Sequence, residues 1–167
     1  MACLQVHTAL LDLLEPEEIQ CILAHELGHL KCEHGVWLTA ANLLGASAAQ
    51  LPLGGLIAAN LEENLLRWLR AAELTCDRAA LLVTQDPRIV CSALMKLAGG
   101  SPKVADHLNV EAFLRQARSY QEASSSPLGW YLHNAQESQL SHPLPVLRAR
   151  EIEEFSKSKE YMNLLRT

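Results

Sequence analysis

Two histidines and a glutamate in the stretch HELGH, residues 25–29, have the types and the spacing needed to bind a divalent metal. On a helix, residues four apart lie on the same face, so His25 and His29 can present both imidazoles to one point. Glu26 is rotated by about 100° around the helix axis, so it can reach a metal-bound water instead of the metal. The motif alone is suggestive, because so short a pattern also arises by composition.

A pair of acidic residues on a separate predicted helix makes the metal interpretation stronger. A catalytic zinc needs a third protein ligand and an open coordination position. In the stretch AAELTCDRAA, Glu73 and Asp77 share a helix face. We expect Glu73 to complete a His2Glu site for one zinc ion per chain. Asp77 can accept the N–H of a ligand histidine, His25 by preference, and fix its tautomer. The alternative is that both acids form a solvated helix face.

The cysteines and the next histidine along the chain do not have metal-site spacing. His34 comes five residues after His29, off the ligand face, and is expected at the surface. The five cysteines are odd in number and contain no CxxC pair, so we interpret them as reduced and mostly buried. Cys32 and Cys76 lie near the motif residues and could bind metal, but a closed thiolate site usually shows paired spacing.

The composition favours a mainly α fold and excludes a nucleic-acid-binding role. Hydrophobic residues make up 49% of the 167 residues, and the abundant Leu and Ala are good helix formers. The net charge is −5 without a basic stripe that would neutralise phosphates, so we expect no nucleic-acid partner. The length suits one domain, residues 1–167, and no shift in composition divides it.

The metal motifs fall on two predicted helices. Apolar residues recur at three- and four-residue steps from Ile19 to about His34, after Pro16 at a plausible first helical position. Residues 62–84 predict the second helix. The β-branched and apolar content of residues 3–11 predicts at most one short N-terminal strand. Further helices are predicted over residues 87–100, over 109–123 and after the two prolines of 141–155, with a loop over 124–129.

The stretch between the two motifs, residues 35–61, carries no charged residue and is long enough to span a bilayer. Pro52 and the pair Gly54-Gly55 break its middle, and polar residues are scattered along it. Two interpretations stay open. The stretch is a helix–turn–helix excursion, buried in the domain or dipping into a membrane surface, or it inserts into or associates tightly with a membrane.

The motifs HELGH and ExxxDRA, the lead-in EPEEIQCILAHELGHLKCEH and the later SHPLPVLRAREIE resemble the gluzincin metalloproteases. Among these, the similarity is to the M48 peptidases, the group of the CAAX prenyl protease and HtpX, over about residues 6–152. The resemblance implies a gluzincin-like helical domain that acts as a zinc-dependent metalloendopeptidase. A zinc-activated water would attack a peptide bond of a protein or peptide substrate, with Glu26 as general base.

The resemblance also implies roles for two late residues. His142 would stabilise the tetrahedral oxyanion, and Arg148 would support the same site. From the residues alone, a histidine before a proline is more often part of a loop. The segments KCEHGVWLT and SSSPLGWY look most like the plant and cyanobacterial branch, which points to a membrane-associated protein in a plastid or thylakoid.

The shortness of the segment before the HELGH helix keeps other functions open. The family usually supplies the strand edge that holds the substrate from this region, yet only about fifteen residues precede the helix here. We therefore interpret the chain as lacking an N-terminal part. One alternative function is a zinc-binding but catalytically weak, membrane-associated scaffold or regulator. The other is a metal-free helical interaction domain in which the motif is accidental.

Overall fold

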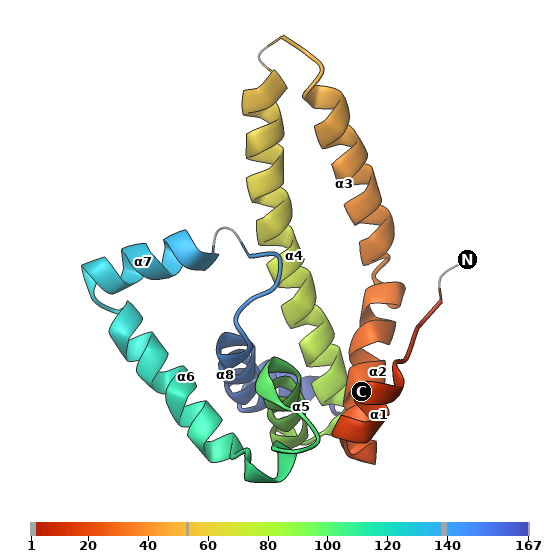
Figure 1. Ribbon diagram of the computed structural model, residues 1–167, viewed down its shortest axis with the longest axis vertical. Coiled ribbons are helices and arrows are strands. Elements are labelled where there is room, and N and C mark those ends of the chain that lie inside the picture. The colour runs from red at the N-terminus through yellow and green to blue at the C-terminus, as the bar shows by residue number, and fades with distance from the viewer. Residues whose placement is uncertain (1–2, 53, 138–139, 167) are drawn as a thin grey trace.

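A computed structural model describes residues 3–52, 54–137 and 140–166 of the chain (Figure 1). Every regular element among these residues is a helix, which confirms the mainly α fold class. The stretch expected as a short strand is instead irregular up to His7 and then forms α1 (Thr8–Leu13). The run of Leu and Ala in this segment favours a helix over a strand, since both are good helix formers.

The two helices that carry the metal motifs lie side by side in the body of the molecule (Figure 1). The first, α2 (Pro16–Lys31), begins with the predicted proline and with a capping box between Glu15 and Glu18. It ends before the predicted His34, because Glu33 has a left-handed backbone with φ of 54°. The second, α4 (Gly54–Thr84), packs against α2 with its C-terminal half.

The uncharged stretch forms a hairpin that projects from the body (Figure 1). Its first arm is α3 (His34–Ala48) and its second is the N-terminal half of α4. The turn between them falls at the predicted break, where a Cβ on Gly54 would come within 1.9 Å of the Ala48 carbonyl oxygen. The interpretation of an excursion buried in the domain is wrong, because α3 has no buried residue. Among the described residues, none of the helices has both the length and the apolar character to cross a bilayer.

The C-terminal half surrounds the lower part of α4 with shorter helices (Figure 1). Their buried apolar side chains form the core with α2 and α4, and include Val90, Leu94 and Ile152. Two differences from the prediction occur here: one helix begins inside the expected loop 124–129, and a last helix follows residue 158. The helices are α5 (Pro87–Gly99), α6 (Val110–Ser124), α7 (Pro127–Glu137), α8 (Pro145–Ser156) and α9 (Lys159–Leu164), with a 3-10 turn at Ala105–His107.

A buried polar cluster joins the start of α2 to α5. The carboxylate of Glu18 accepts hydrogen bonds from Lys96 Nζ at 2.7 Å and from Ser92 Oγ at 2.5 Å. The same carboxylate accepts from the backbone N–H of Glu15 at 2.9 Å. Glu18 is therefore buried with its charge paired and its oxygens satisfied, as a buried carboxylate requires. The cluster fixes the helix that carries the HELGH motif against its neighbour.

Candidate metal centre

Three side chains from α2 and α4 bring lone pairs to one point. Nε2 of His25 lies 3.1 Å from Nε2 of His29. Glu73 Oε2 lies 3.5 Å from the first of these nitrogens, and Glu73 Oε1 lies 3.2 Å from the second. Ligand atoms bonded to a tetrahedral zinc at about 2.0–2.2 Å are about 3.3–3.6 Å apart, so these separations are within or slightly below the spacing that a zinc ion between them would require. The donor set, two imidazoles and a carboxylate, is also one that zinc accepts.

Asp77 and Arg148 form a second layer behind these three side chains. Asp77 is almost fully buried and accepts the N–H at Nδ1 of His25 at 3.0 Å. Its two oxygens also accept from Arg148, from Nη2 at 2.6 Å and from Nε at 2.8 Å. Nη1 of Arg148 lies 3.3 Å from Glu73 Oε2. Arg148 thus holds the carboxylates of Glu73 and Asp77 in place, and Asp77 fixes the tautomer in which His25 offers Nε2.

The electrostatics of the centre keep its acids ionised. Burial raises the pKa of Asp77, but the hydrogen bonds from Arg148 and His25 outweigh it and hold that pKa below the usual range. Burial likewise raises the pKa of Glu73, and the hydrogen bond from His25 and the charge of Arg148 reverse the shift. For His25, burial lowers the pKa, but the two carboxylates raise it to about 9. Glu73 and Asp77 are therefore ionised at neutral pH, and their charges are balanced by Arg148 and His25.

Glu26 and His142 lie on the cavity that opens beside the centre. The cavity has a volume of about 720 Å³ and is lined by both residues as well as by His25, His29 and Glu73. Glu26 is exposed on α2, next to the first ligand. His142, on the segment before α8, keeps two thirds of its side chain exposed, and its Nε2 lies 3.4 Å from Glu73 Oε1. The remaining lining is mostly apolar: Ile22, Leu30, Leu38, Leu69, Leu94 and Leu97.

His34 is the residue that sequence reasoning missed. The expectation of a surface position assumed that the helix runs through residue 34, whereas α2 ends at Lys31 and the left-handed backbone of Glu33 separates it from α3. Nδ1 of His34 therefore comes to 2.9 Å from Nδ1 of His29. A signal was present in the sequence, because the apolar periodicity of the helix stops at Leu30.

The cysteines are free and mostly buried, as predicted. Cys21, Cys76 and Cys91 are buried, whereas Cys3 and Cys32 are exposed, and all five are free thiols. Burial raises the pKa of the Cys91 thiol to about 12, so this thiol stays protonated at neutral pH.

Comparisons with known proteins give relatives over most of the chain. The family model described as Peptidase family M48 matches residues 3–156. The chain is 70% identical over 162 residues to "Plastoglobule-localized metallopeptidase 48, chloroplastic" of Arabidopsis thaliana, which covers 96% of this chain and 47% of that protein. It is 30% identical over 128 residues to "Protease HtpX homolog 2" of Methanosarcina mazei, 62% of this chain and 44% of that protein.

A third relative is similar to the same degree. The chain is 30% identical over 125 residues to "Protease HtpX homolog 1" of Streptomyces coelicolor, with 59% of this chain and 41% of that protein covered. The chain thus spans less than half the length of these curated relatives. No solved structure matches it.

Proposed function

The chain belongs to peptidase family M48, and from this membership and the geometry of the centre we propose that it is the catalytic part of a zinc-dependent metalloendopeptidase. The observation that carries the proposal is the convergence of Nε2 of His25, Nε2 of His29 and the Glu73 carboxylate at zinc-ligand spacing. A solvated helix face would not bury Glu73, nor would it back that residue with a largely buried arginine.

Each residue of the centre has a defined part in peptide hydrolysis. A zinc ion held by His25, His29 and Glu73 would supply a Lewis acid that polarises the peptide carbonyl and acidifies a water. Glu26 acts as the general base, since its exposed carboxylate faces the cavity beside the ligands. It takes the proton of the attacking water and delivers it to the nitrogen of the leaving amine.

His142 and Arg148 have different parts, although both lie near Glu73. The exposed ring of His142 can turn toward the cavity and donate a hydrogen bond to the developing oxyanion. Arg148 makes two hydrogen bonds with Asp77 and is mostly buried, so its guanidinium is occupied behind the ligands. We assign to Arg148 the positioning of the two acids rather than contact with substrate.

The cavity indicates the class of substrate. Its walls are mostly apolar, with polar groups concentrated at the metal centre. A protein or peptide with an apolar side chain beside the scissile bond fits these walls.

A second function, a zinc-binding but catalytically weak scaffold or regulator, has one observation in its favour. The described residues contain no strand, so they offer no sheet edge on which a peptide could lie as an added strand.

The relatives and the hairpin together support a location. The name of the Arabidopsis relative places that protein in the chloroplast and at the plastoglobule. We infer a plastid location for this chain as well. The α3–α4 hairpin exposes large apolar side chains, including Trp37, Leu43, Leu44 and Leu56, and a patch of this kind marks an interaction surface. We propose that the hairpin lies against a lipid surface.

Replacing Glu26 by Gln tests the function. The variant should bind one zinc per chain like the wild type but lose cleavage of casein by at least about 100-fold, because the general base is gone and the ligands remain. Glu17→Gln, an exposed glutamate on the same helix, is the matched control and should cleave normally. Equal zinc content with no cleavage by the wild type would favour the scaffold or regulator, and a folded wild type without zinc would overturn both functions.

A further inference from the structure

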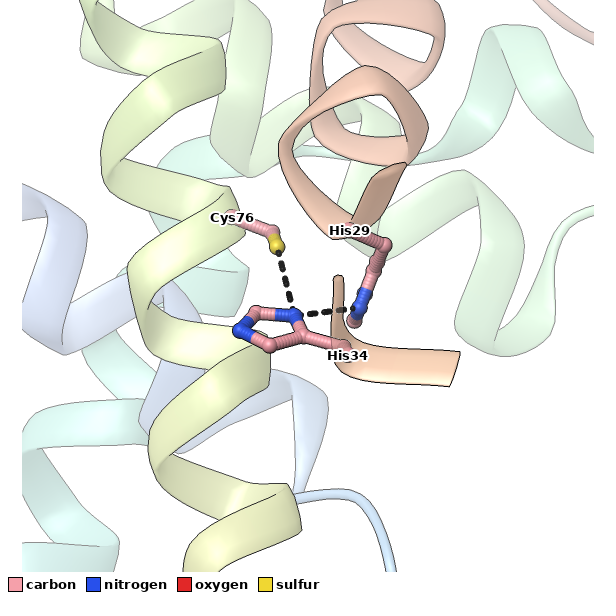
Figure 2. Close-up of side chains that lie close together, drawn as sticks. All are labelled: His29, His34 and Cys76. Carbon is pink, nitrogen blue, oxygen red and sulfur yellow. Dashed lines mark hydrogen bonds between the residues drawn. The ribbon is translucent and has the colours of Figure 1, made fainter. Parts of the chain in front are cut away.

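A second cluster of metal-ligating side chains, shown in Figure 2, includes His29 and His34 from the lining of the cavity and Cys76 behind them. It consists of Nδ1 of His29, Nδ1 of His34 and Sγ of Cys76, which come from α2, α3 and α4 and lie within 4.8 Å of one another. The two nitrogens are 2.9 Å apart, and the sulfur is 3.7 Å from His34 Nδ1. His29 belongs to both clusters, because its Nε2 faces His25 and Glu73.

The contacts within this cluster meet at a single atom. Nδ1 of His34 has either one proton or one lone pair, yet two partners, His29 and Cys76, compete for it. A cation between the three atoms would accept a lone pair from each. Ligands of a tetrahedral zinc, with sulfur at about 2.3 Å and nitrogen at about 2.0–2.1 Å, place sulfur about 3.6 Å from nitrogen. The separation of 3.7 Å between Cys76 and His34 agrees with that value, whereas the two nitrogens, 2.9 Å apart, would move apart by a few tenths of an ångström around the ion.

Neighbouring side chains hold the cluster in place, and an ion can reach it from the cavity. The ring of His34 meets the edge of Trp68 in a T-shaped contact with 5.4 Å between centroids, which holds the ring in place. Cys76 has no exposed surface, but His34 is only half-buried and lines the cavity. An ion can therefore enter from the cavity past His34, by the route that serves the metal centre.

We propose that His34, Cys76 and Nδ1 of His29 form a second cation site for a soft divalent ion, such as cadmium or zinc in excess, and that its occupation inhibits the first site. A thiolate and two imidazoles are ligands that soft and borderline cations prefer. Binding releases the thiol proton of Cys76 and the Nδ1 proton of His29 to solvent. Because this second proton must be lost from a ring shared with the first site, the second ion binds more weakly than the first and disturbs His29.

The experiment uses cadmium, whose bond to a thiolate gives a charge-transfer absorption in the near ultraviolet. The exposed thiols are first removed by Cys3→Ser and Cys32→Ser, and this form serves as the wild type of the titration. Cadmium is titrated into it and into its variants Cys76→Ala, Cys91→Ala and His25→Gln. We expect the band in the wild type and in Cys91→Ala, whose buried thiol lies outside the cluster. It should persist in His25→Gln, which damages the first site alone, and disappear in Cys76→Ala. A wild type without the band, or a Cys76→Ala variant that keeps it, would overturn the proposal.

His34→Gln keeps the test decisive if Cys76→Ala does not fold, which circular dichroism will show. This variant changes a half-buried residue and should weaken cadmium binding by at least about tenfold, the loss expected for one lost ligand. Unchanged binding would mean that His34 serves only as a hydrogen-bond partner of His29, against the proposal.

The inhibitory consequence rests on the proposed protease function, whereas the site itself does not. Cleavage of casein is measured with one equivalent of zinc and again with excess zinc. Excess zinc should reduce cleavage by the wild type and by Cys91→Ala. Cleavage by Cys76→Ala should be the same with and without the excess. Equal inhibition of all three would remove the regulatory role. A wild type that shows the cadmium band but never cleaves would contradict the protease function and leave the cation site standing.

Discussion

Asp77 connects the two layers of the centre, because it binds His25 on one side and Arg148 on the other. Replacing Asp77 should disturb the centre even when the new side chain has the same shape, because its buried carboxylate has a partner on each side. An amide at this position would offer one oxygen where two now accept, and it would leave the largely buried charge of Arg148 paired with Glu73 alone instead of with two carboxylates.

Asp77→Asn should therefore weaken zinc binding by about 10–100-fold while the chain stays helical. The zinc affinity is measured by competition with a chelator of known strength. Asp12→Asn, an exposed aspartate on α1, serves as the control and should leave the affinity unchanged. An Asp77→Asn variant with wild-type affinity would show that the tautomer of His25 does not depend on this residue.

At the residue scale, the sequence predicted which side chains share a helix face. It did not predict the contacts between side chains that are distant along the chain. The spacing of HELGH and of Glu73 with Asp77 pointed to side chains that the structure brings together, since helix geometry fixes which side chains share a face. Arg148 is 71 residues from Asp77 along the chain, so its two hydrogen bonds could not be derived from any local pattern. His34 was misplaced because one left-handed residue, Glu33, redirects the chain.

At the scale of the helices, the close packing of α2 against α4 depends on Gly28. A Cβ at this position would lie 3.1 Å from Cys76 Sγ and 3.4 Å from Cys76 Cα. A larger side chain would push apart the two helices that carry the ligands. Gly45 on α3 offers a matched comparison, since a Cβ added there would meet no atom within 4 Å.

Gly28→Leu should therefore reduce zinc binding by at least about tenfold, because the ligands on α2 move away from Glu73. Gly45→Leu should leave zinc binding unchanged. Because Leu is a good helix former in both helices, a difference between the two variants does not come from helix propensity. Zinc per chain after dialysis against a weak chelator is the readout. Equal zinc content in the two variants would contradict the close packing of α2 on α4.

The Glu18–Lys96 pair gives a second prediction for the elements. Lys96→Met should lower the free energy of unfolding by about 3 kcal/mol, because it leaves the Glu18 carboxylate buried without its cation. Adding Glu18→Gln should restore part of the loss, since a neutral amide needs no counter-charge. Lys157→Met removes an exposed pair with Glu153 and should cost less than about 1 kcal/mol. Urea unfolding measures all three, and similar losses for Lys96→Met and Lys157→Met would refute the buried role.

The sequence was enough to predict that the elements are helices, but it predicted less well where each helix begins and ends. Pro16 and the apolar repeat placed α2, and Pro52 with Gly54 marked the turn of the hairpin. The start of α7 at Pro127 falls inside the predicted loop, because the serines before it resemble loop sequence. The strand expected near Val6 came from composition alone, and the leucines beside it form α1 instead.

The whole molecule consists of a compact helical body with the metal centre and a projecting hairpin with an apolar surface (Figure 1). The cavity reaches the base of the hairpin, because Gly35 and Leu38 of α3 line it. A lipid surface bound by the hairpin would therefore lie on the side of the molecule where α3 meets the cavity.

Leu43→Asp should weaken binding to lipid vesicles by several-fold, since a charge opposes burial of the exposed α3 face. Leu128→Asp on α7 changes a side chain with the same exposed fraction outside the hairpin and should bind like the wild type. Flotation of the chain with galactolipid and phosphatidylglycerol vesicles measures both. Equal flotation of the two variants would assign lipid binding to another surface, or to none.

The identity of the zinc ligands is tested most directly by X-ray absorption at the zinc edge of the chain loaded with one equivalent. We predict two imidazole nitrogens and a carboxylate oxygen at about 2.0–2.2 Å, without a sulfur neighbour at about 2.3 Å. That result would assign the first zinc to His25, His29 and Glu73. A sulfur neighbour at one equivalent would instead place the first ion at Cys76, and a folded chain that retains no zinc would contradict the metal centre altogether.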